Sequence, residues 1–120
     1  MAKILLVDDE PDVLKATRMV LRMDGHEVET TNTSHNAVAR ILSGDYDLAI
    51  VDLMMPIVSG EEILEQVKVA RPDFPILLLS GTADMFSYDR LVKLGAISLL
   101  DKPFEPQRLL ELVRLAVAHT

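Results

Sequence analysis

Short apolar runs alternate with segments of helical spacing along the whole 120-residue chain. The apolar runs lie at 4–7, 26–30, 47–51, 76–79 and 96–100. The sequences ILLV, DLAIV and ILLL among them are almost continuously apolar, which is typical of strands buried on both faces of a parallel sheet. This alternation predicts five successive strand–helix units.

The intervening segments have the apolar spacing of amphipathic helices, and their ends are marked by proline and glycine. Pro11 suits the first turn of the first helix. Gly25, Gly44 and Gly95 follow helical segments, where a residue in the left-handed conformation commonly closes a helix. Strict alternation predicts a parallel α/β sheet with right-handed crossovers and helices on both faces. The ligand site of such a sheet lies beyond the C-terminal ends of its strands.

Composition excludes several classes of function. Lys and Arg number 12 against 19 Asp and Glu, giving a net charge of -7 without a basic run, so we do not expect this domain to bind nucleic acid. The absence of cysteine excludes disulfides, thiolate chemistry and cysteine-ligated zinc. Because the sequence contains neither a membrane-spanning stretch nor a signal peptide at 1–7, we expect it in the cytoplasm, with no membrane contact.

The length and uniform composition indicate one domain over residues 1–120. The first predicted strand follows Met1 almost directly, so we expect the domain to be N-terminal in its protein. The chain ends just after the fifth helical segment. It is therefore either a stand-alone domain or a piece of a longer protein.

Polar side chains follow four of the predicted strands, in chain order Asp8, Asp9 and Glu10, then Asp52, then Ser80, and then Lys102. Each has an ordinary structural explanation when taken alone; an acidic residue at position 9 or 10, for example, can cap the helix that follows. Parallel strands, however, end at the same edge of their sheet. Their joint placement therefore indicates a functional site.

The residue types at this edge suit phosphoryl transfer. Clustered carboxylates raise one another's pKa and need a compensating cation, and Mg²⁺ prefers such oxygen ligands. Asp52 is a candidate nucleophile, because a carboxylate can attack phosphorus to form an aspartyl phosphate. Ser80 and Lys102 would then stabilise the negative charge on the phosphoryl oxygens.

Five motifs in this order resemble the receiver domain of two-component response regulators over residues 3–118. They are VDDE at 7–10, DLMMPIVSG at 52–60, LSGTAD at 79–84, LGA at 94–96 and DKPF at 101–104. The resemblance implies a flavodoxin-like, doubly wound sheet of five parallel strands in the order 2-1-3-4-5, flanked by five helices. It also implies a cis peptide bond between Lys102 and Pro103.

The same resemblance assigns roles to single residues. Asp52 is the expected phosphoacceptor, and Ser80 and Lys102 are expected to bind the phosphoryl oxygens. The expected Mg²⁺ ligands are Asp8, Asp9, Asp52 and the backbone carbonyl of Met54. The implied phosphodonor is a sensor histidine kinase or a histidine phosphotransfer protein. The domain is not an enzyme in the usual sense, since it catalyses only its own phosphorylation and slow dephosphorylation.

Leu99 departs from the family pattern, because most receiver domains have Tyr or Phe three positions before the strand-five lysine. Leu115 falls outside the predicted core face of the last helix. Together with Leu99 and with Phe86 or Tyr88, it predicts an apolar patch that binds an output partner or a second copy of the domain.

Three alternative functions compete with a phosphoaccepting receiver domain. A pseudo-receiver that signals by protein contact alone would be compatible with Leu99. A haloacid dehalogenase-type phosphatase requires a second acid two residues after the nucleophile, where Met54 stands. A flavodoxin-like cofactor binder would prefer a Ser/Thr/Gly-rich loop after the first strand, where this chain has DDEPD.

Overall fold

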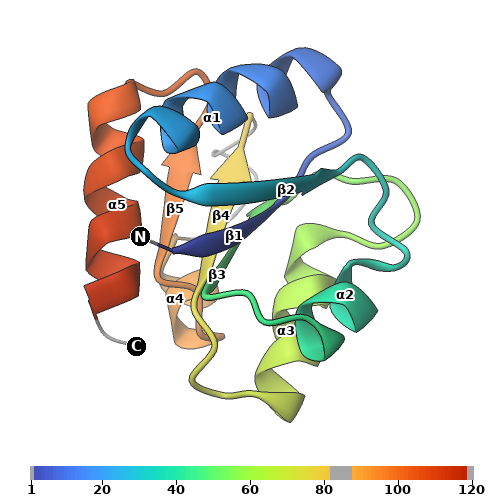
Figure 1. The fold of residues 1–120 in the computed structure, drawn as a ribbon. Coiled ribbons are helices and arrows are strands. Elements are labelled where there is room, and N and C mark those ends of the chain that lie inside the picture. Colours follow the sequence, from blue (N-terminus) through green and yellow to red (C-terminus); the bar gives the residue numbers. More distant parts are fainter. Residues whose placement is uncertain (1, 82–87, 119–120) are drawn as a thin grey trace.

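The computed structural model describes residues 2–81 and 88–118. Within these residues, five parallel strands form one sheet in the order β2-β1-β3-β4-β5, as the sequence predicted (Figure 1). The strands are β1 (Lys3–Val7), β2 (Glu27–Thr31), β3 (Leu48–Asp52), β4 (Ile76–Ser80) and β5 (Ser98–Asp101). Their bounds differ from the predicted apolar runs by one or two residues.

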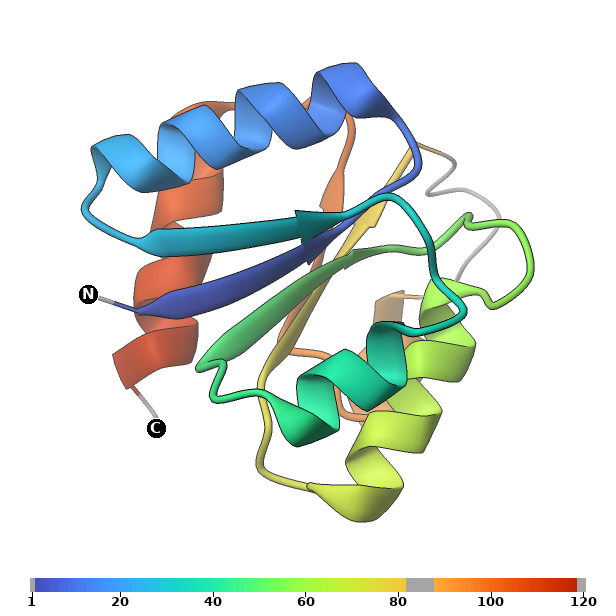
Figure 2. The ribbon, with the colours of Figure 1, turned by 45° about the vertical axis from the view of Figure 1, so that its right-hand side comes forward.

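Helices cover both faces of this sheet (Figures 1 and 2). One face carries α1 (Pro11–Met23) and α5 (Pro106–Ala118). The other face carries α2 (Ala37–Ser43), α3 (Gly60–Ala70) and α4 (Tyr88–Lys93). Among the described residues, no helix combines the length and the apolar character needed to cross a bilayer.

The two core layers follow from the alternation of side chains along each strand. In β1, Ile4 and Leu6 pack in the layer beneath α1 and α5, whereas Leu5 and Val7 pack in the layer beneath α2, α3 and α4. Every residue of β3 and of β4 is buried. This explains their continuously apolar sequences, because both faces of the central strands need apolar side chains.

All three predicted glycines lie at or just after a helix end, and two of them have the predicted left-handed conformation. Gly25 and Gly95 have φ values of +90° and +115°, in the left-handed region that favours glycine. Gly44 directly follows the last residue of α2, but the left-handed conformation predicted for it is wrong, because its φ of -88° is open to any residue. Glycine is needed there for space instead: a Cβ atom would lie 2.5 Å from the ring of Tyr46 and 2.8 Å from the carbonyl oxygen of Arg40.

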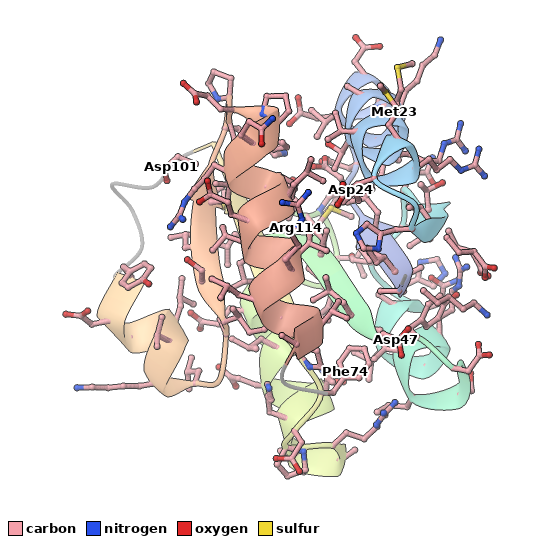
Figure 3. All side chains as sticks on the ribbon, turned by 60° about the vertical axis from the view of Figure 1, so that its left-hand side comes forward. Met23, Asp24, Asp47, Phe74, Asp101 and Arg114 are labelled. Atoms are coloured by element: carbon pink, nitrogen blue, oxygen red, sulfur yellow. The ribbon has the colours of Figure 1, made fainter. Side chains whose placement is uncertain are left out.

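Polar contacts join the C-terminal end of α1 to α5 and to the start of β1. The Arg114 guanidinium donates to Asp24 Oδ1 over 3.0 Å, and this hydrogen bond holds the pKa of Asp24 below its usual value (Figure 3). His26 Nε2 lies 3.4 Å from Asp24 Oδ2, while its Nδ1 accepts the backbone N–H of Ala2. The carboxylate of Asp24 therefore already has a cationic partner, Arg114, within the domain.

Candidate functional site

Four strands deliver polar side chains to the C-terminal edge of the sheet. Asp8 follows β1, Asp52 is the last residue of β3, Ser80 is the last residue of β4, and Lys102 follows β5. The side chains of Asp8, Asp52 and Ser80 are buried. Residues that lie up to 94 positions apart in the sequence are thus brought together, as the alternating pattern predicted.

The Lys102 ammonium group is surrounded by three carboxylates. Its Nζ lies 2.7 Å from Asp8 Oδ2, 3.1 Å from Glu10 Oε1 and 3.4 Å from Asp52 Oδ2. Burial lowers the pKa of Lys102, but the hydrogen bond to Asp8 and the charges of Asp52 and Asp8 outweigh it, so the net pKa is raised. Lys102 therefore stays protonated and supplies the positive charge of the site.

The backbone around Lys102 fixes its position over the sheet edge. Its N–H donates to the carbonyl oxygen of Ser80 over 2.7 Å, which continues the pairing of β5 with β4. The Lys102–Pro103 peptide bond is cis, in agreement with the prediction from the family resemblance. Ser80 directly follows Leu79, the residue paired in register with Asp52, so Ser80 lies next to the acidic group.

Asp52 has an unusual environment for a carboxylate. Burial raises its pKa from 3.8 to about 6, and the negative charge of Asp8 acts in the same direction. The positive charge of Lys102 and the N–H of Met54, which donates to Asp52 Oδ1 over 3.4 Å, oppose this shift only in part. Near neutral pH the group is still mainly ionised, and its negative charge is poorly solvated.

The acidic cluster has a donor set that fits a magnesium ion. One carboxylate oxygen from each of Asp8, Asp9, Glu10 and Asp52 lies within 4.8 Å of all the others. Asp8 and Asp52 are buried, whereas Asp9 and Glu10 are exposed. An all-oxygen set that is open to water on one side is what Mg²⁺ prefers, because it retains several water ligands.

The predicted ligand role of the Met54 carbonyl stays a prediction. The loop after β3 does bend back over the site, because the Met54 N–H points to the Asp52 carboxylate. The Met54 side chain is half exposed and takes no part in the core. Thr82 of the third motif, LSGTAD at 79–84, lies outside the described residues.

Glu10 was placed at the acidic sheet edge by the sequence, but no role was assigned to it. It forms the N-cap position of α1 but its side chain makes no capping hydrogen bond, which leaves the carboxylate available to Lys102. Instead, the Glu10 N–H donates to Asp8 Oδ1 over 2.9 Å. The sequence did contain the signal, because Pro11 fixes the start of the helix and hence the place of Glu10 beside the sheet edge.

Gly60 is a second residue whose importance the sequence analysis missed. It begins α3, and its N–H donates to the carbonyl oxygen of Leu53 over 3.0 Å. A Cβ atom at this position would lie 2.5 Å from the carbonyl oxygen of Asp52 and 2.7 Å from the Cα of Leu53. The first turn of α3 can therefore pack on the end of β3 only because residue 60 has no side chain.

The sheet order and the acidic edge around a buried lysine define the class of CheY-like α/β domains. The family model of the response regulator receiver domain matches residues 4–114. The chain therefore belongs to the receiver domain family of two-component response regulators.

Relatives and solved structures agree with this assignment. The chain is 34% identical to the response regulator SaeR of Staphylococcus epidermidis over 109 residues, which are 91% of this chain and 47% of that protein. It thus spans about half the length of this relative. A receiver domain protein from Clostridium thermocellum superimposes with a TM-score of 0.89 at 32% identity, covering 98% and 95% of the two chains. CheY4 of Vibrio cholerae superimposes with a TM-score of 0.84 at 30% identity, covering 97% and 98%.

Proposed function

We propose that this domain accepts a phosphoryl group on Asp52, in a Mg²⁺-dependent reaction, from the phosphohistidine of a sensor kinase or a histidine phosphotransfer protein. The observation that carries the proposal is the burial of the Asp52 carboxylate beside Asp8, 3.4 Å from the Lys102 ammonium. Phosphoryl transfer needs mainly positioning and positive charge, and this edge of the sheet offers both.

In the proposed reaction an oxygen of Asp52 forms a bond to phosphorus while the bond from phosphorus to the donor histidine breaks, and the histidine nitrogen keeps the electron pair. Lys102 and the Ser80 hydroxyl would bind phosphoryl oxygens. Magnesium, when bound, would supply further positive charge to those oxygens. The residues that would hold it are Asp8, Asp9, Asp52 and the backbone carbonyl of Met54. Slow hydrolysis of the acyl phosphate would return the domain to its starting state.

A groove of about 450 Å³ next to Lys102 offers a place for the phosphodonor protein. Its largely apolar walls come from α1 and from the loop after β5, and they include Val13, Ala16, Val20, Pro103, Phe104 and Pro106. A donor helix bound there would bring its histidine close to Asp52. We also propose that the domain and its donor lie in the cytoplasm.

We expect wild-type protein to gain the mass of one phosphoryl group when it is incubated with acetyl phosphate and Mg²⁺. The gain should disappear with EDTA, because the clustered carboxylates then lack their compensating cation. Intact-mass spectrometry before and after hydroxylamine treatment, which cleaves acyl phosphates, measures both results. Equal uptake in EDTA would contradict the metal site. Absence of uptake from small donors and from phosphohistidine proteins alike would favour a pseudo-receiver.

We further propose that phosphorylation changes the surface formed by α4, β5 and α5. Leu115 and Tyr88 are 54% and 51% exposed on this surface. Leu99 is partly buried and packs against the core layer beneath α2, α3 and α4. Phe86, which the sequence analysis also named, lies outside the described residues. The surface would bind an output partner or a second copy of the domain, and its switch would be a population shift between existing states.

The expected result is a change in amide exchange at residues 88–118 when the domain is converted to its beryllofluoride complex. The physical reason is that Ser80 and Lys102 move toward the phosphoryl mimic, and both are continuous with β4 and β5. Hydrogen–deuterium exchange measured by mass spectrometry resolves this segment. Protection changes limited to the loops after β1, β3 and β4 would show that output runs through another surface.

A further inference from the structure

The outward face of α1 carries three cations and two methionines in one continuous stripe. We call this the α1 stripe, and its residues are Lys15, Arg18, Met19, Arg22 and Met23. Their spacing of three and four positions places them on one side of the helix. They enclose a shallow groove of about 340 Å³. This side of α1 differs from the one that carries Val13, Ala16 and Val20 beside the phosphoacceptor site.

The cations of the α1 stripe are not neutralised within the domain. In the part of the chain that the structure describes, Lys15, Arg18 and Arg22 form no ion pair, whereas six of the other nine Lys and Arg side chains do. Asp24, which directly follows α1, pairs with Arg114 of α5 instead (Figure 3). Like charges three and four residues apart destabilise a helix.

The methionines of the α1 stripe are unusually accessible. Met19 is 57% exposed and Met23 is 82% exposed. They stand four residues apart, so together they form a short apolar seam flanked by the three cations. Methionine is a flexible side chain that adapts to different partner surfaces, and both Met and Arg are enriched at protein interfaces.

We propose that the α1 stripe binds an acidic amphipathic helix of a partner protein. The apolar side of that helix would cover Met19 and Met23, and its carboxylates would pair with Arg18, Arg22 and Lys15. Arginine forms paired hydrogen bonds with carboxylates, which gives such a contact a defined geometry. Binding also relieves the repulsion among the three cations. The stripe extends over residues 15–23 of one continuous helix, which suits the packing of helix against helix.

Two other classes of partner fit these observations less well. The domain has a net charge of -7, so a nucleic acid or an anionic membrane would be repelled by most of its surface. The α1 stripe contains no aromatic residue, and the opposite side of α1 is packed on the sheet, so the helix is unable to enter a lipid interface. A single acidic helix needs to contact only the stripe.

The test is an NMR titration of ¹⁵N-labelled domain with amphipathic helical peptides of about 20 residues. All peptides have the same leucine face, and the flanking residues are Glu, Gln or Lys. We expect the Glu peptide to shift amide signals of residues 11–25 and to bind at least about tenfold more tightly than the Gln peptide, with no binding by the Lys peptide. Higher salt should weaken binding of the Glu peptide.

Variants distinguish binding by the α1 stripe from a general effect of the charge of the domain. Arg18→Glu combined with Arg22→Glu should lower affinity at least about tenfold, and Met19→Gln combined with Met23→Gln should lower it while leaving the charge unchanged. Lys93→Glu removes another exposed cation, on α4, and should have no effect. Circular dichroism confirms that each variant is folded.

Equal affinity of the Glu and Lys peptides, or signal shifts centred outside α1, would overturn the proposal. So would a loss of affinity in Lys93→Glu equal to that in the double arginine variant. Absence of binding by any peptide at about 1 mM, a concentration that detects even weak contacts, would overturn it as well. Binding of anionic lipid vesicles or duplex DNA through these residues, without binding of the Glu peptide, would also overturn it. All measurements use unphosphorylated protein, so their outcome is independent of the phosphoacceptor role of Asp52.

Discussion

Replacement of Asp52 by Asn is expected to abolish phosphoryl uptake and, in the same variant, to stabilise the metal-free domain. The amide is a far weaker nucleophile than the carboxylate, so no acyl phosphate forms. It is also uncharged, so it removes the cost of a buried negative charge beside Asp8. These opposite effects on activity and stability distinguish a functional carboxylate from one that stabilises the fold.

The stabilising effect has a defined pH dependence. Because folding raises the pKa of Asp52 from 3.8 to about 6, the folded domain binds more protons than the unfolded chain between these two values. The stability of the wild-type domain therefore falls as pH rises from about 4 to about 6. The stability of Asp52→Asn should not fall in this way, because its amide does not ionise. The free energy of unfolding of Asp52→Asn should equal that of wild type below pH about 4 and exceed it by about 2 to 3 kcal/mol above pH about 6.

Urea unfolding in EDTA at several pH values measures this difference. Asp73→Asn is a matched control, because Asp73 is an exposed carboxylate in the loop between α3 and β4, at the opposite edge of the sheet. It should leave stability nearly unchanged at every pH. A pH-independent advantage of Asp52→Asn, or a loss of stability, would contradict the electrostatic account of the site.

The fold could be predicted from the sequence because its strongest constraint is repeated along the chain. Residues 48–52 and 76–80 are buried on both faces, and a nearly continuous apolar run indicates such strands without further information. The convergence of Asp8, Asp52 and Lys102 then follows from topology, since parallel strands place their C-terminal ends at the same edge. Neither inference requires knowledge of how a particular side chain is oriented.

The features that the sequence analysis missed depend on contacts between segments. The carboxylate of Glu10 turns to Lys102, which is 92 residues away, and the local sequence equally allowed it to cap α1. Gly44 is required by the ring of Tyr46 and not by its own backbone angles. A sequence pattern reports local preferences of the backbone, whereas close approach between two segments is a property of the packed structure.

Gly60 gives the clearest example of such a contact, and its replacement by alanine is expected to destabilise the domain strongly. The new methyl group would meet the carbonyl oxygen of Asp52 at 2.5 Å, the Cα of Leu53 at 2.7 Å and the carbonyl carbon of Asp52 at 3.0 Å. All three are backbone atoms of the β3 end, so no side chain can rotate away. Overpacking of this kind costs about 1 to 3 kcal/mol or more.

Two other glycines separate this steric effect from the general consequences of replacing glycine. Gly81→Ala adds a methyl group into open space and should change stability little. Gly25→Ala also meets no atom within 4 Å, but its φ of +90° should cost about 1 to 2 kcal/mol through backbone strain alone. Gly60→Ala has ordinary backbone angles, so any cost beyond that of Gly81→Ala must come from contact with β3.

The same clash should displace Asp52, the proposed phosphoacceptor. Relief of the contact requires α3 to move away from β3 or the Asp52–Leu53 backbone to shift, and the second response displaces the carboxylate from Lys102 and Asp8. We therefore expect Gly60→Ala, at a temperature where it is still folded, to take up phosphoryl groups about tenfold or more slowly than Gly25→Ala of comparable stability. Urea unfolding and timed intact-mass measurements give the two quantities. Equal uptake rates in these two variants would show that α3 moves instead and that the acidic site does not depend on the close packing of Gly60.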